Sequence, residues 1–552
     1  GAVVKAMAIC TRHQYLHIYK PVLLLALDNY FQDPSVECLA SLYEAVNSMD
    51  CKFMPIFNAH EKAILRASEN KDMFEEKFTA FENNRKHVQE SSTVSLSDQL
   101  SDEISGKGLG IINENSEGYG SDYVIVSEEE REKLKRGTYI DLAPNLSKNK
   151  DRHFFETKVV YNGIKLPIRV PLTVNPEEVG DFSLIKLITT FNPPSPAPFN
   201  HPFHPHLDSS GNQTQPIILL LNALLTQKRI IFLGQGHPSG DVANYVLSAC
   251  AMGSGSGGVL RGFTERAFPY TNLTNVDDLL KVPGFIAGVT NRIFEDHSSW
   301  WDVLCNIDTG KITVMHAIQH HYGETAIRGK FQEYVQRFVR LTALYEVETF
   351  GSTKIGMMPE DTDYPGILST GLAFQDDNSK HREFAANVNR IEGWRQTISY
   401  KYYQLDFQNY LKTRNIKSFD VHHQVSKLKL LKSLPEQEVE TLYKAFVNSI
   451  STDEQIIEFL SYLPQNQGGL FPIGLGLFYP LKTVRDNTIE LFNRLNSHAT
   501  GSKFIQSLNS FQKLAYERQF NQKRERQQQL EFANKLACSQ DSNDSNLEFM
   551  EF

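Results

Sequence analysis

The feature that most limits the possible folds is a series of short apolar segments between residues 216 and 290. The segment "PIILLLNALLTQK", which starts at Pro216, is apolar nearly throughout and predicts a buried helix. It leads into an apolar strand at residues 229–233, a loop, a helix, and then the strand-like segment "GFIAGVT" at residues 284–290. Strands that alternate with helices predict a largely parallel or mixed sheet with both faces covered.

The loop in "IIFLGQGHPSGDVANYVLSAC" has only part of a nucleotide-binding pattern. Gly234 and Gly236 fit the G-x-G-x-x-G dinucleotide pattern, but Ser239 occupies its third glycine position. The loop lacks the G-K-[ST] ending of a Walker loop, and Asp241 in the first turn of the next helix would repel a phosphate. We therefore predict a strand-to-helix corner that holds no cofactor, with Ser239 as the N-cap of the helix.

Composition narrows the class of protein. The chain has 552 residues, a length typical of about three or four domains. Its net charge of −9 argues against a nucleic-acid-binding protein. Six cysteines are scattered without a C-x-x-C pair, which suits a reducing cytosol, and no apolar run approaches the ~18 residues of a membrane span. We therefore expect a cytoplasmic protein without a transmembrane segment.

Shifts in composition divide the chain into regions. Residues 83–150 are rich in Ser, Glu, Asp, Asn and Gly, so they are expected to form a disordered linker in which residues 88–136 are quickly cut by proteases. The other expected regions are a first module at 1–82, a central α/β module at 151–346, a loop at 347–381, a helical module at 382–525 and a polar tail at 526–552 with a disordered end.

Local patterns place elements near the start of the chain. "VVKAMAICTR" at residues 3–12 predicts a strand, and two amphipathic helices follow it. Since one strand cannot make a sheet, its partners are expected elsewhere in the chain or in residues lost before Gly1. Asn162-Gly163, between two strand-like runs, predicts a β-hairpin.

Two patterns in the central module predict a helix start and a second hairpin. Thr274, followed three residues later by Asp277, is a variant of the capping box, and it predicts Thr274 as an N-cap. "WWDVLCNIDTGKITV" predicts a hairpin that turns at residues 308–310.

Two segments of the helical module have alternative interpretations. "GGLFPIGLGLFYPL" at residues 468–481 is apolar with helix breakers, and it predicts a buried connection rather than a membrane contact. "SKLKLLKSLP" at residues 426–435 is basic and predicts a solvated helix face, with an acidic partner or lipid as the alternative.

A histidine cluster is the sharpest metal candidate. "HPFHPHLD" supplies His201, His204, His206 and Asp208, whose imidazoles and carboxylate suit zinc. The segment has no cysteine, and no H-E-x-x-H helix completes a site. The favoured alternative is a proline-rich loop whose histidines pack or face water.

The segment after "GFIAGVT" is the candidate partner-binding site. Arg292, Glu295 and Asp296 lie near Trp300 and Trp301, two of only three tryptophans in the chain. Loops at strand ends carry function in α/β folds, and Arg and Trp are the most common interface hot spots. The alternative is that both tryptophans cover the core.

From "PIILLLNALLTQKRIIFLGQG" through "FPYTNL" to "VPGFIAGV", the chain closely resembles the DENN superfamily, and more narrowly the fungal Arf-interacting proteins that stabilise the polarity axis. "FNHPFHPHLD" fits the lead-in of the same family, which weakens the metal hypothesis. The resemblance covers residues 153–345 well and the C-terminal helices less well. It implies a longin-like module before a central α/β DENN module and a helical module after it, with a Rab GTPase held between the first two. Residues 1–82 match only the C-terminal part of the longin-like module, whose front strands are missing here.

The resemblance implies a regulator of a small GTPase, Rab or Arf, in vesicle traffic and polarised growth. The first hypothesis is a guanine-nucleotide exchange factor that works by binding the nucleotide-free GTPase, without covalent catalysis. The alternative is a non-catalytic effector or polarity scaffold, and a metal-dependent enzyme at the histidine cluster comes last. We expect a cytoplasmic protein recruited peripherally to the plasma membrane or vesicles at sites of polarised growth.

Overall fold

The computed structural model describes two compact units of the chain. Residues 7–13, 15–49, 51, 54–78, 151–175, 177–178, 180, 182–191, 207, 214–310, 312, 324–357, 368, 370–430 and 434–547 are described. The first unit comprises Gly1–Asp50, Phe57–Ser68 and Glu156–Phe552, and the second comprises Cys51–Ile56 and Glu69–Phe155. The predicted linker at 83–150 lies outside the described residues.

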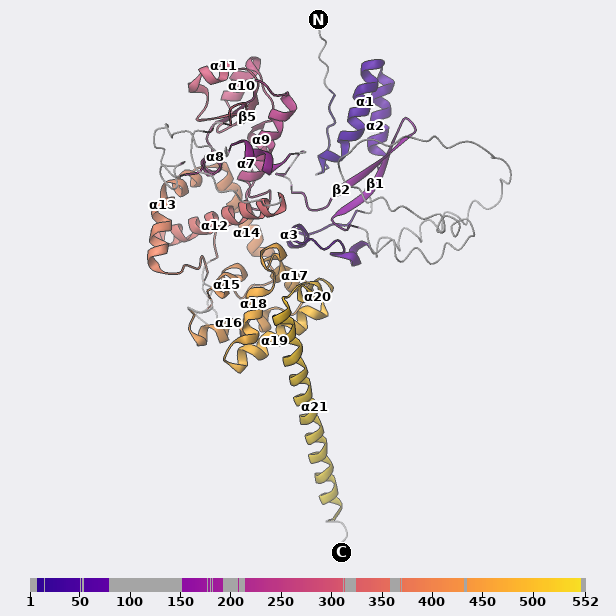
Figure 1. Ribbon diagram of the computed structural model, residues 1–552, viewed down its shortest axis with the longest axis vertical. Coiled ribbons are helices and arrows are strands. Elements are labelled where there is room, and N and C mark those ends of the chain that lie inside the picture. The colour runs from indigo at the N-terminus through magenta and orange to yellow at the C-terminus, as the bar shows by residue number, and fades with distance from the viewer. Residues whose placement is uncertain are drawn as a thin grey trace, which may run out of the picture. The chain divides into compact units, whose positions relative to one another are not determined.

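The first unit begins with helices and a hairpin. The 3-10 helix η1 (Leu16–Tyr19) leads into α1 (Lys20–Gln32), and α2 (Val36–Asn47) lies beside α1 (Figure 1). The predicted hairpin is confirmed as β1 (Phe154–Tyr161) and β2 (Ile164–Pro171), with Asn162 and Gly163 at positive φ in the turn.

The opening strand prediction is wrong for the residues described, because residues 7–13 have no regular structure. The hairpin forms a separate two-stranded sheet and packs on the helices instead. The Tyr161 hydroxyl accepts a hydrogen bond from the Asn29 amide at 3.3 Å and lies 3.6 Å from the Cys38 thiol. The helices therefore cover the hairpin without an additional strand from residues 7–13.

The central sheet has four strands in the order β4-β5-β3-β6. They are β3 (Ile230–Leu233), β4 (Ala267–Phe268), β5 (Ile286–Val289) and β6 (Val303–Asn306). All three pairings are parallel, and Phe232 lies opposite both Gly288 and Cys305. The apolar runs at residues 216–225 and 230–233 are a helix and a strand, as predicted.

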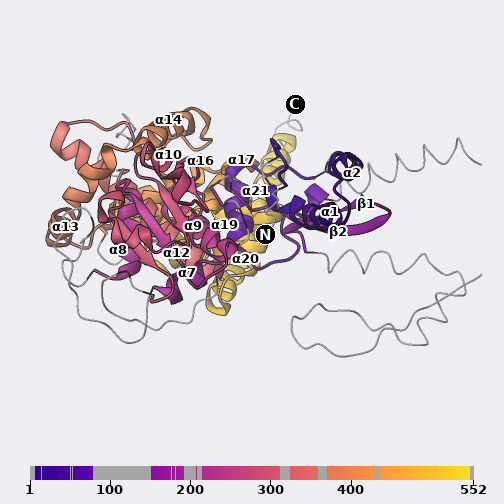
Figure 2. The ribbon, with the colours of Figure 1, turned by 90° about the horizontal axis from the view of Figure 1, so that it is seen from above.

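Alternate residues of each strand face two different cores. Ile230 and Phe232 belong to the larger core, whereas Ile231 and Leu233 belong to the smaller one. The larger core is built with α7 (Leu184–Thr190), α8 (Pro216–Leu225), α9 (Ser239–Gly253), α12 (Glu324–Phe350) and α13 (Asp377–Arg395), of which Figure 2 shows α8, α9 and α12 grouped around the strands. The smaller core is covered by α10 (Val276–Leu280), α11 (Ile293–Asp296) and the 3-10 helix η5 (Ser298–Trp300).

Both predicted N-caps are wrong. Pro238 is the N-cap of α9, and Ser239 is already the first residue of the helix. The N-cap of α10 is Asn275, and Thr274 lies inside the 3-10 helix η4 (Leu273–Asn275), which Asn272 caps by accepting a hydrogen bond from the Thr274 backbone N–H at 3.1 Å. The sequence offered two capping residues close together, and the first one formed the turn.

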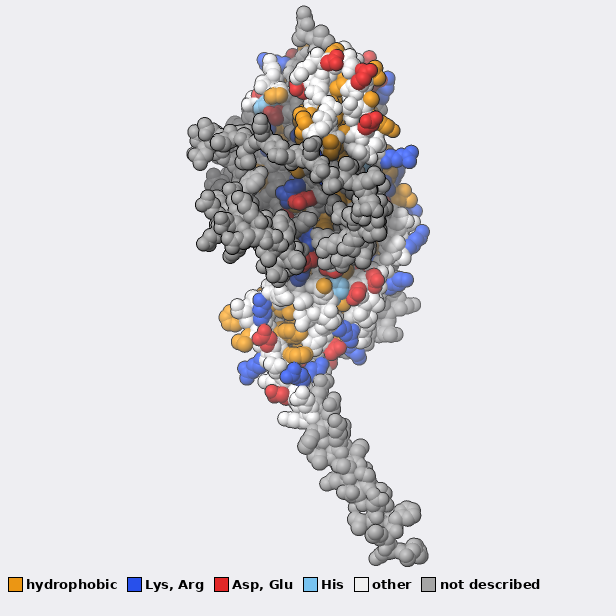
Figure 3. Space-filling view, turned by 90° about the vertical axis from the view of Figure 1, so that its right-hand side faces the viewer, with side chains coloured by type: hydrophobic (Ala, Val, Ile, Leu, Met, Phe, Trp, Pro, Cys, Tyr) orange, Lys and Arg blue, Asp and Glu red, His pale blue; other side chains and the backbone are white. Residues whose placement is uncertain are grey.

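The helical region consists of many short helices. They are α14 (Ile398–Thr413), α15 (Val421–Leu428), α16 (Glu436–Ser449), α17 (Asp453–Ser461), η7 (Gln465–Gln467), α18 (Phe471–Gly474), η8 (Leu475–Phe478), α19 (Lys482–Ser497), α20 (Ala499–Gln506) and α21 (Ser510–Leu547). Figure 3 shows hydrophobic and basic side chains interspersed on one face of this region. Helix α21 continues through most of the predicted polar tail, since that stretch has no Gly or Pro to stop it.

Two further expectations in this region have different outcomes. The apolar stretch 468–481 is a buried connection at Leu470, Ile473 and Leu477, as predicted, but Phe471 and Phe478 of the same stretch are exposed. The prediction of a solvated basic face is wrong for Lys427, which is buried and forms an ion pair with Glu438. A buried ammonium group is accommodated only because a carboxylate faces it.

The described part of the second unit is small. Its buried Arg152 donates its backbone N–H to the Lys71 oxygen at 2.7 Å, and its guanidinium lies 4.8 Å from the centre of the Phe78 ring. Glu75 lies 3.7 Å from the same guanidinium. These contacts join the short stretch after residue 68 to the residues that precede β1.

Candidate functional site

The predicted partner-binding segment crosses one face of the central sheet. It leaves the end of β5 at Val289, forms α11 and η5, and reaches the start of β6 at Asp302. The Asp302 carboxylate accepts a hydrogen bond from the backbone N–H of Arg229 at 2.7 Å, which fixes the far end of the segment beside the start of β3. The segment therefore covers the smaller core from the inner strand β5 to the edge strand β6.

The charged residues of this segment point to solvent. Arg292 and Asp296 are exposed and Glu295 is partly exposed. The Arg292 guanidinium lies 3.5 Å from the Glu295 carboxylate, one helical turn away. Such exposed pairs contribute little to stability, so both groups are available to a partner at low cost.

The two tryptophans are half-buried and pack against the smaller core. The Trp301 indole N–H donates to the Phe294 backbone oxygen at 2.7 Å. The Trp300 ring lies edge-on to Phe294 at 5.3 Å between centroids and stacks on His297 at 4.3 Å. Both rings therefore help cover the core, and each also leaves part of its surface beside the exposed charges.

Phe294 organises this segment, although the sequence interpretation did not single it out. It is fully buried and contacts the Trp300 ring, and its backbone oxygen binds the other tryptophan. The available signal was an apolar residue flanked by charges in "RIFED". One buried anchor in a polar turn is enough to hold a short helix against a sheet.

The loop after β3 is closed by a carboxylate of the protein itself. The Asp308 carboxylate accepts from the backbone N–H groups of Gln235 at 2.7 Å and Gly236 at 2.8 Å. A Cβ atom at Gly236 would lie 2.9 Å from an Asp308 oxygen, so the glycine leaves room for this contact. The predicted strand-to-helix corner is present between β3 and α9, and the Asp308 carboxylate occupies two backbone N–H groups of its loop.

The same aspartate stands at the predicted turn of the second hairpin. Strand β6 is present but pairs with β3 in parallel. Most of the expected return strand after Gly310 lies outside the described residues.

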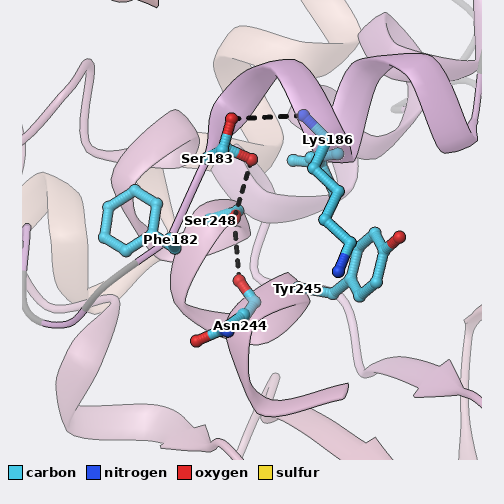
Figure 4. A pocket seen from close by; sticks show the side chains of 7 residues that line it. Phe182, Ser183, Lys186, Asn244, Tyr245 and Ser248 are labelled. Atoms are coloured by element: carbon cyan, nitrogen blue, oxygen red, sulfur yellow. Dashed lines mark hydrogen bonds between the residues drawn. The ribbon is translucent and has the colours of Figure 1, made fainter. Parts of the chain in front are cut away.

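A hollow of about 260 Å³ lies between α7 and α9 (Figure 4). The Ser248 hydroxyl in its wall donates to the backbone oxygen of Asn244 at 2.7 Å, and the Lys186 ammonium lies 3.5 Å from the Asp241 carboxylate. Lys186 also lies 5.6 Å from the centre of the Tyr245 ring. These polar groups of the hollow therefore already have partners within the protein.

The metal hypothesis falls largely outside the described structure. His201, His204, His206 and Asp208 are not among the described residues. In the parts of the chain that are described, no group of three or more His, Cys, Asp or Glu side chains is arranged to hold a metal ion. Nor does any described helix have the length and apolar character needed to cross a membrane.

Comparison with known proteins finds one family match to the central region and one relative along most of the chain. Residues 203–316, which include β3 to β6, match the family model described as stabilization of polarity axis. The chain is 27% identical over 550 residues to the AFI1-like protein C776.06c of Schizosaccharomyces pombe, covering 92% of this chain and 80% of that protein. No solved structure matches the chain. The chain is therefore similar to the stabilization-of-polarity-axis family in its sheet region and to an AFI1-like protein along most of its length.

Proposed function

We propose that this chain acts in polarised growth by binding a small GTPase of the Arf type. The observation that carries the proposal is the match of the central sheet region to the polarity-axis family, together with similarity to an AFI1-like protein along most of the chain. The Arf-interacting proteins that the sequence resembles supply the expected partner.

The first mode of action is that of an effector or scaffold. Neither the family description nor the relative's name refers to nucleotide exchange. In this mode the protein recognises the GTP-bound switch regions and recruits further partners, and its work is binding alone. Exposed charges beside half-buried tryptophans, as at Arg292 and Trp301, suit such recognition.

The second mode is guanine-nucleotide exchange on a Rab or Arf protein by a DENN-type fold. The order helix α8, strand β3, helix α9, strand β5 supports it, because the DENN resemblance rests on that order. An exchange factor would bind the nucleotide-free GTPase most tightly and so accelerate nucleotide release. The GTPase would then contact the loops at the ends of the parallel strands, where α11 begins.

One experiment separates the two modes. The purified chain is mixed with a panel of Arf and Rab proteins loaded with fluorescent GDP, and nucleotide release is followed. In parallel, binding is measured to the same GTPases held in the GDP and GTP states. An effector binds one GTP-loaded Arf and leaves release unchanged, whereas an exchange factor accelerates release. If no member of the panel binds in any nucleotide state, the proposed function is wrong.

A further inference from the structure

The region from α18 into α21 has a charge opposite to that of the whole chain. Residues 471–526 contain nine Lys and Arg against four Asp and Glu, a net charge of +5 in a chain of net charge −9. Lys482, Lys513, Arg518 and Arg524 make no ion pair with any residue that the structure describes. An anionic partner at this region would therefore meet four cations that no described carboxylate neutralises.

Large apolar side chains are exposed in the same region. Phe511 is 81% exposed and Leu514 is 65% exposed, both on α21. Phe471 on α18 is 49% exposed and Phe478 on η8 is 56% exposed. Single exposed apolar residues are ordinary, but four in adjoining elements indicate a contact surface.

Hydrogen bonds hold these elements against one another. The Gln512 side chain, next to Phe511 in α21, donates to the backbone oxygen of Phe471 at 3.0 Å. Seven residues further along α21, about two helical turns, the Gln519 side chain donates to the backbone oxygen of Leu477 at 2.8 Å. The exposed phenylalanines are therefore carried by a fixed framework, which lowers the entropy cost of binding through them.

Cations accompany the apolar residues on α21. Phe511, Leu514 and Arg518 follow the three- and four-residue spacing of one helix face, and Lys513 adjoins them. We name the set the apolar-basic surface, and it comprises Phe471, Phe478, Phe511, Lys513, Leu514 and Arg518.

We propose that the apolar-basic surface docks on an anionic lipid bilayer. Aromatic and aliphatic side chains that project from a helical framework enter the boundary between headgroups and acyl chains, while neighbouring Lys and Arg contact anionic headgroups. The local charge of +5 in an acidic protein complements an anionic bilayer at this surface. The inference does not rest on the proposed GTPase, because it uses no residue of the segment at 292–301.

The test is binding of the full chain to vesicles. Phosphatidylcholine vesicles with and without phosphatidylserine are sedimented with the protein at low and high salt. Binding is expected only to the vesicles that contain phosphatidylserine and is expected to weaken with salt. The variants Phe511→Ser/Leu514→Ser and Lys513→Glu/Arg518→Glu are each expected to lose on the order of tenfold in affinity, since each buried apolar group and each surface cation contributes.

A matched control uses the same kinds of change on another helix. Lys401 and Leu405 are exposed one turn apart on α14, and Leu405 is 57% exposed. Lys401→Glu/Leu405→Ser is expected to bind vesicles as the unaltered chain does. The proposal would be overturned if the control variant lost vesicle binding as the α21 variants do, or if both α21 variants bound vesicles normally. It would also be overturned if the chain bound an acidic protein but no vesicles. GTPase binding measured on the same variants is expected to be unchanged, which separates this result from the proposed function.

Discussion

Strands β3 and β5 of the central sheet bury only apolar side chains, whereas the junction where α12 meets α15 contains buried charges. The sheet side chains Ile230, Phe232 and Leu233 are buried among other apolar groups. At the other place, the Arg340 guanidinium lies 2.7 Å from the Asp420 carboxylate, which is almost fully buried. Packing and strand register stabilise the first region. Paired charges hold the second, and the folded protein loses stability there if either partner is removed.

Helix α3 (Ala59–Ala67) belongs to the charged kind of interior. Arg66 pairs with the buried Glu178 and donates to the Ser256 oxygen at 2.8 Å. Near its other end, the His60 ring lies 2.9 Å from the Ser461 hydroxyl in α17. A nine-residue helix is marginal alone, so these contacts with two distant parts of the chain hold it in place. Polar contacts specify where helices from distant parts of the sequence meet.

The largest expected effect comes from removing Arg340. Arg340→Ala leaves the Asp420 carboxylate buried without its guanidinium partner and is expected to cost about 3 kcal/mol. Urea unfolding measures the loss, and hydrogen exchange in α15 is expected to rise first.

Arg337→Ala on the same helix is the matched control. Arg337 pairs with Glu383 nearer the surface, and its loss is expected to cost less than about 1 kcal/mol. Equal losses in the two variants would mean that the buried pair has no special role at this junction.

Acid is expected to weaken the charged interior and spare the sheet. Burial lowers the pKa of His422 to about 3 and that of His423 to about 4, with Arg340 adding to the effect at both. The folded state therefore binds fewer protons than the unfolded state below the ordinary histidine pKa of 6.5, and stability falls as the pH drops. At about pH 4.5 each histidine is expected to cost on the order of 2 kcal/mol.

Hydrogen exchange of α15 and of β3, corrected for the intrinsic effect of pH, measures this contrast. Asp420 acts in the same direction, since pairing with Arg340 holds its pKa at about 2 against the cost of burial. His422→Gln/His423→Gln is expected to flatten the pH dependence of α15. Protection of α15 that stays constant from neutral pH to about pH 4.5 would contradict the prediction.

Local patterns predicted the apolar interior well and could not predict the charged one. The strand at residues 230–233 can be recognised from sequence because burial on both faces of a parallel sheet requires unbroken apolar residues, and helix α8 at residues 216–225 is apolar because it is buried nearly all round. His60 and Ser461 lie 401 residues apart, and nothing near either residue indicates the other. The ion pair of Lys427 with Glu438 likewise could not be predicted from the basic residues around Lys427, which indicated a solvated face.

The candidate site was foreseeable only in part. Charge alone indicated that Arg292 and Asp296 would be exposed, and they are. The place of Trp301 depended on a hydrogen bond to the Phe294 backbone, which no spacing rule reveals. The role of Asp308 was missed because its partners, the N–H groups of Gln235 and Gly236, lie 73 and 72 residues away.

An intermediate loss of stability is expected from a change on the face of the sheet that carries the smaller core. Trp301→Ala removes a half-buried ring and its hydrogen bond to Phe294, so it is expected to cost about 2 kcal/mol, less than a fully buried aromatic. Trp301→Phe keeps most of the packing and is expected to lose about 1 kcal/mol. A loss in the phenylalanine variant as large as that of the alanine variant would assign the effect to the hydrogen bond rather than to packing.

The smallest effect on stability, and the sharpest on recognition, is expected from Arg292→Ala/Glu295→Ala. The pair is exposed and separated by 3.5 Å, so its loss is expected to change the free energy of unfolding by less than about 0.5 kcal/mol. If this surface contacts the GTPase, the same variant is expected to weaken binding by about tenfold or more, because a desolvated arginine at an interface commonly contributes at least 1–2 kcal/mol. Lys281→Ala/Asp278→Ala, an exposed pair on the adjoining α10 turn, is the control and is expected to leave affinity unchanged. If the Arg292 and Glu295 variant binds every Arf and Rab protein tested as tightly as the unaltered chain does, α11 only covers the core. The face of the sheet with the smaller core would then have no role in recognition that the other face lacks.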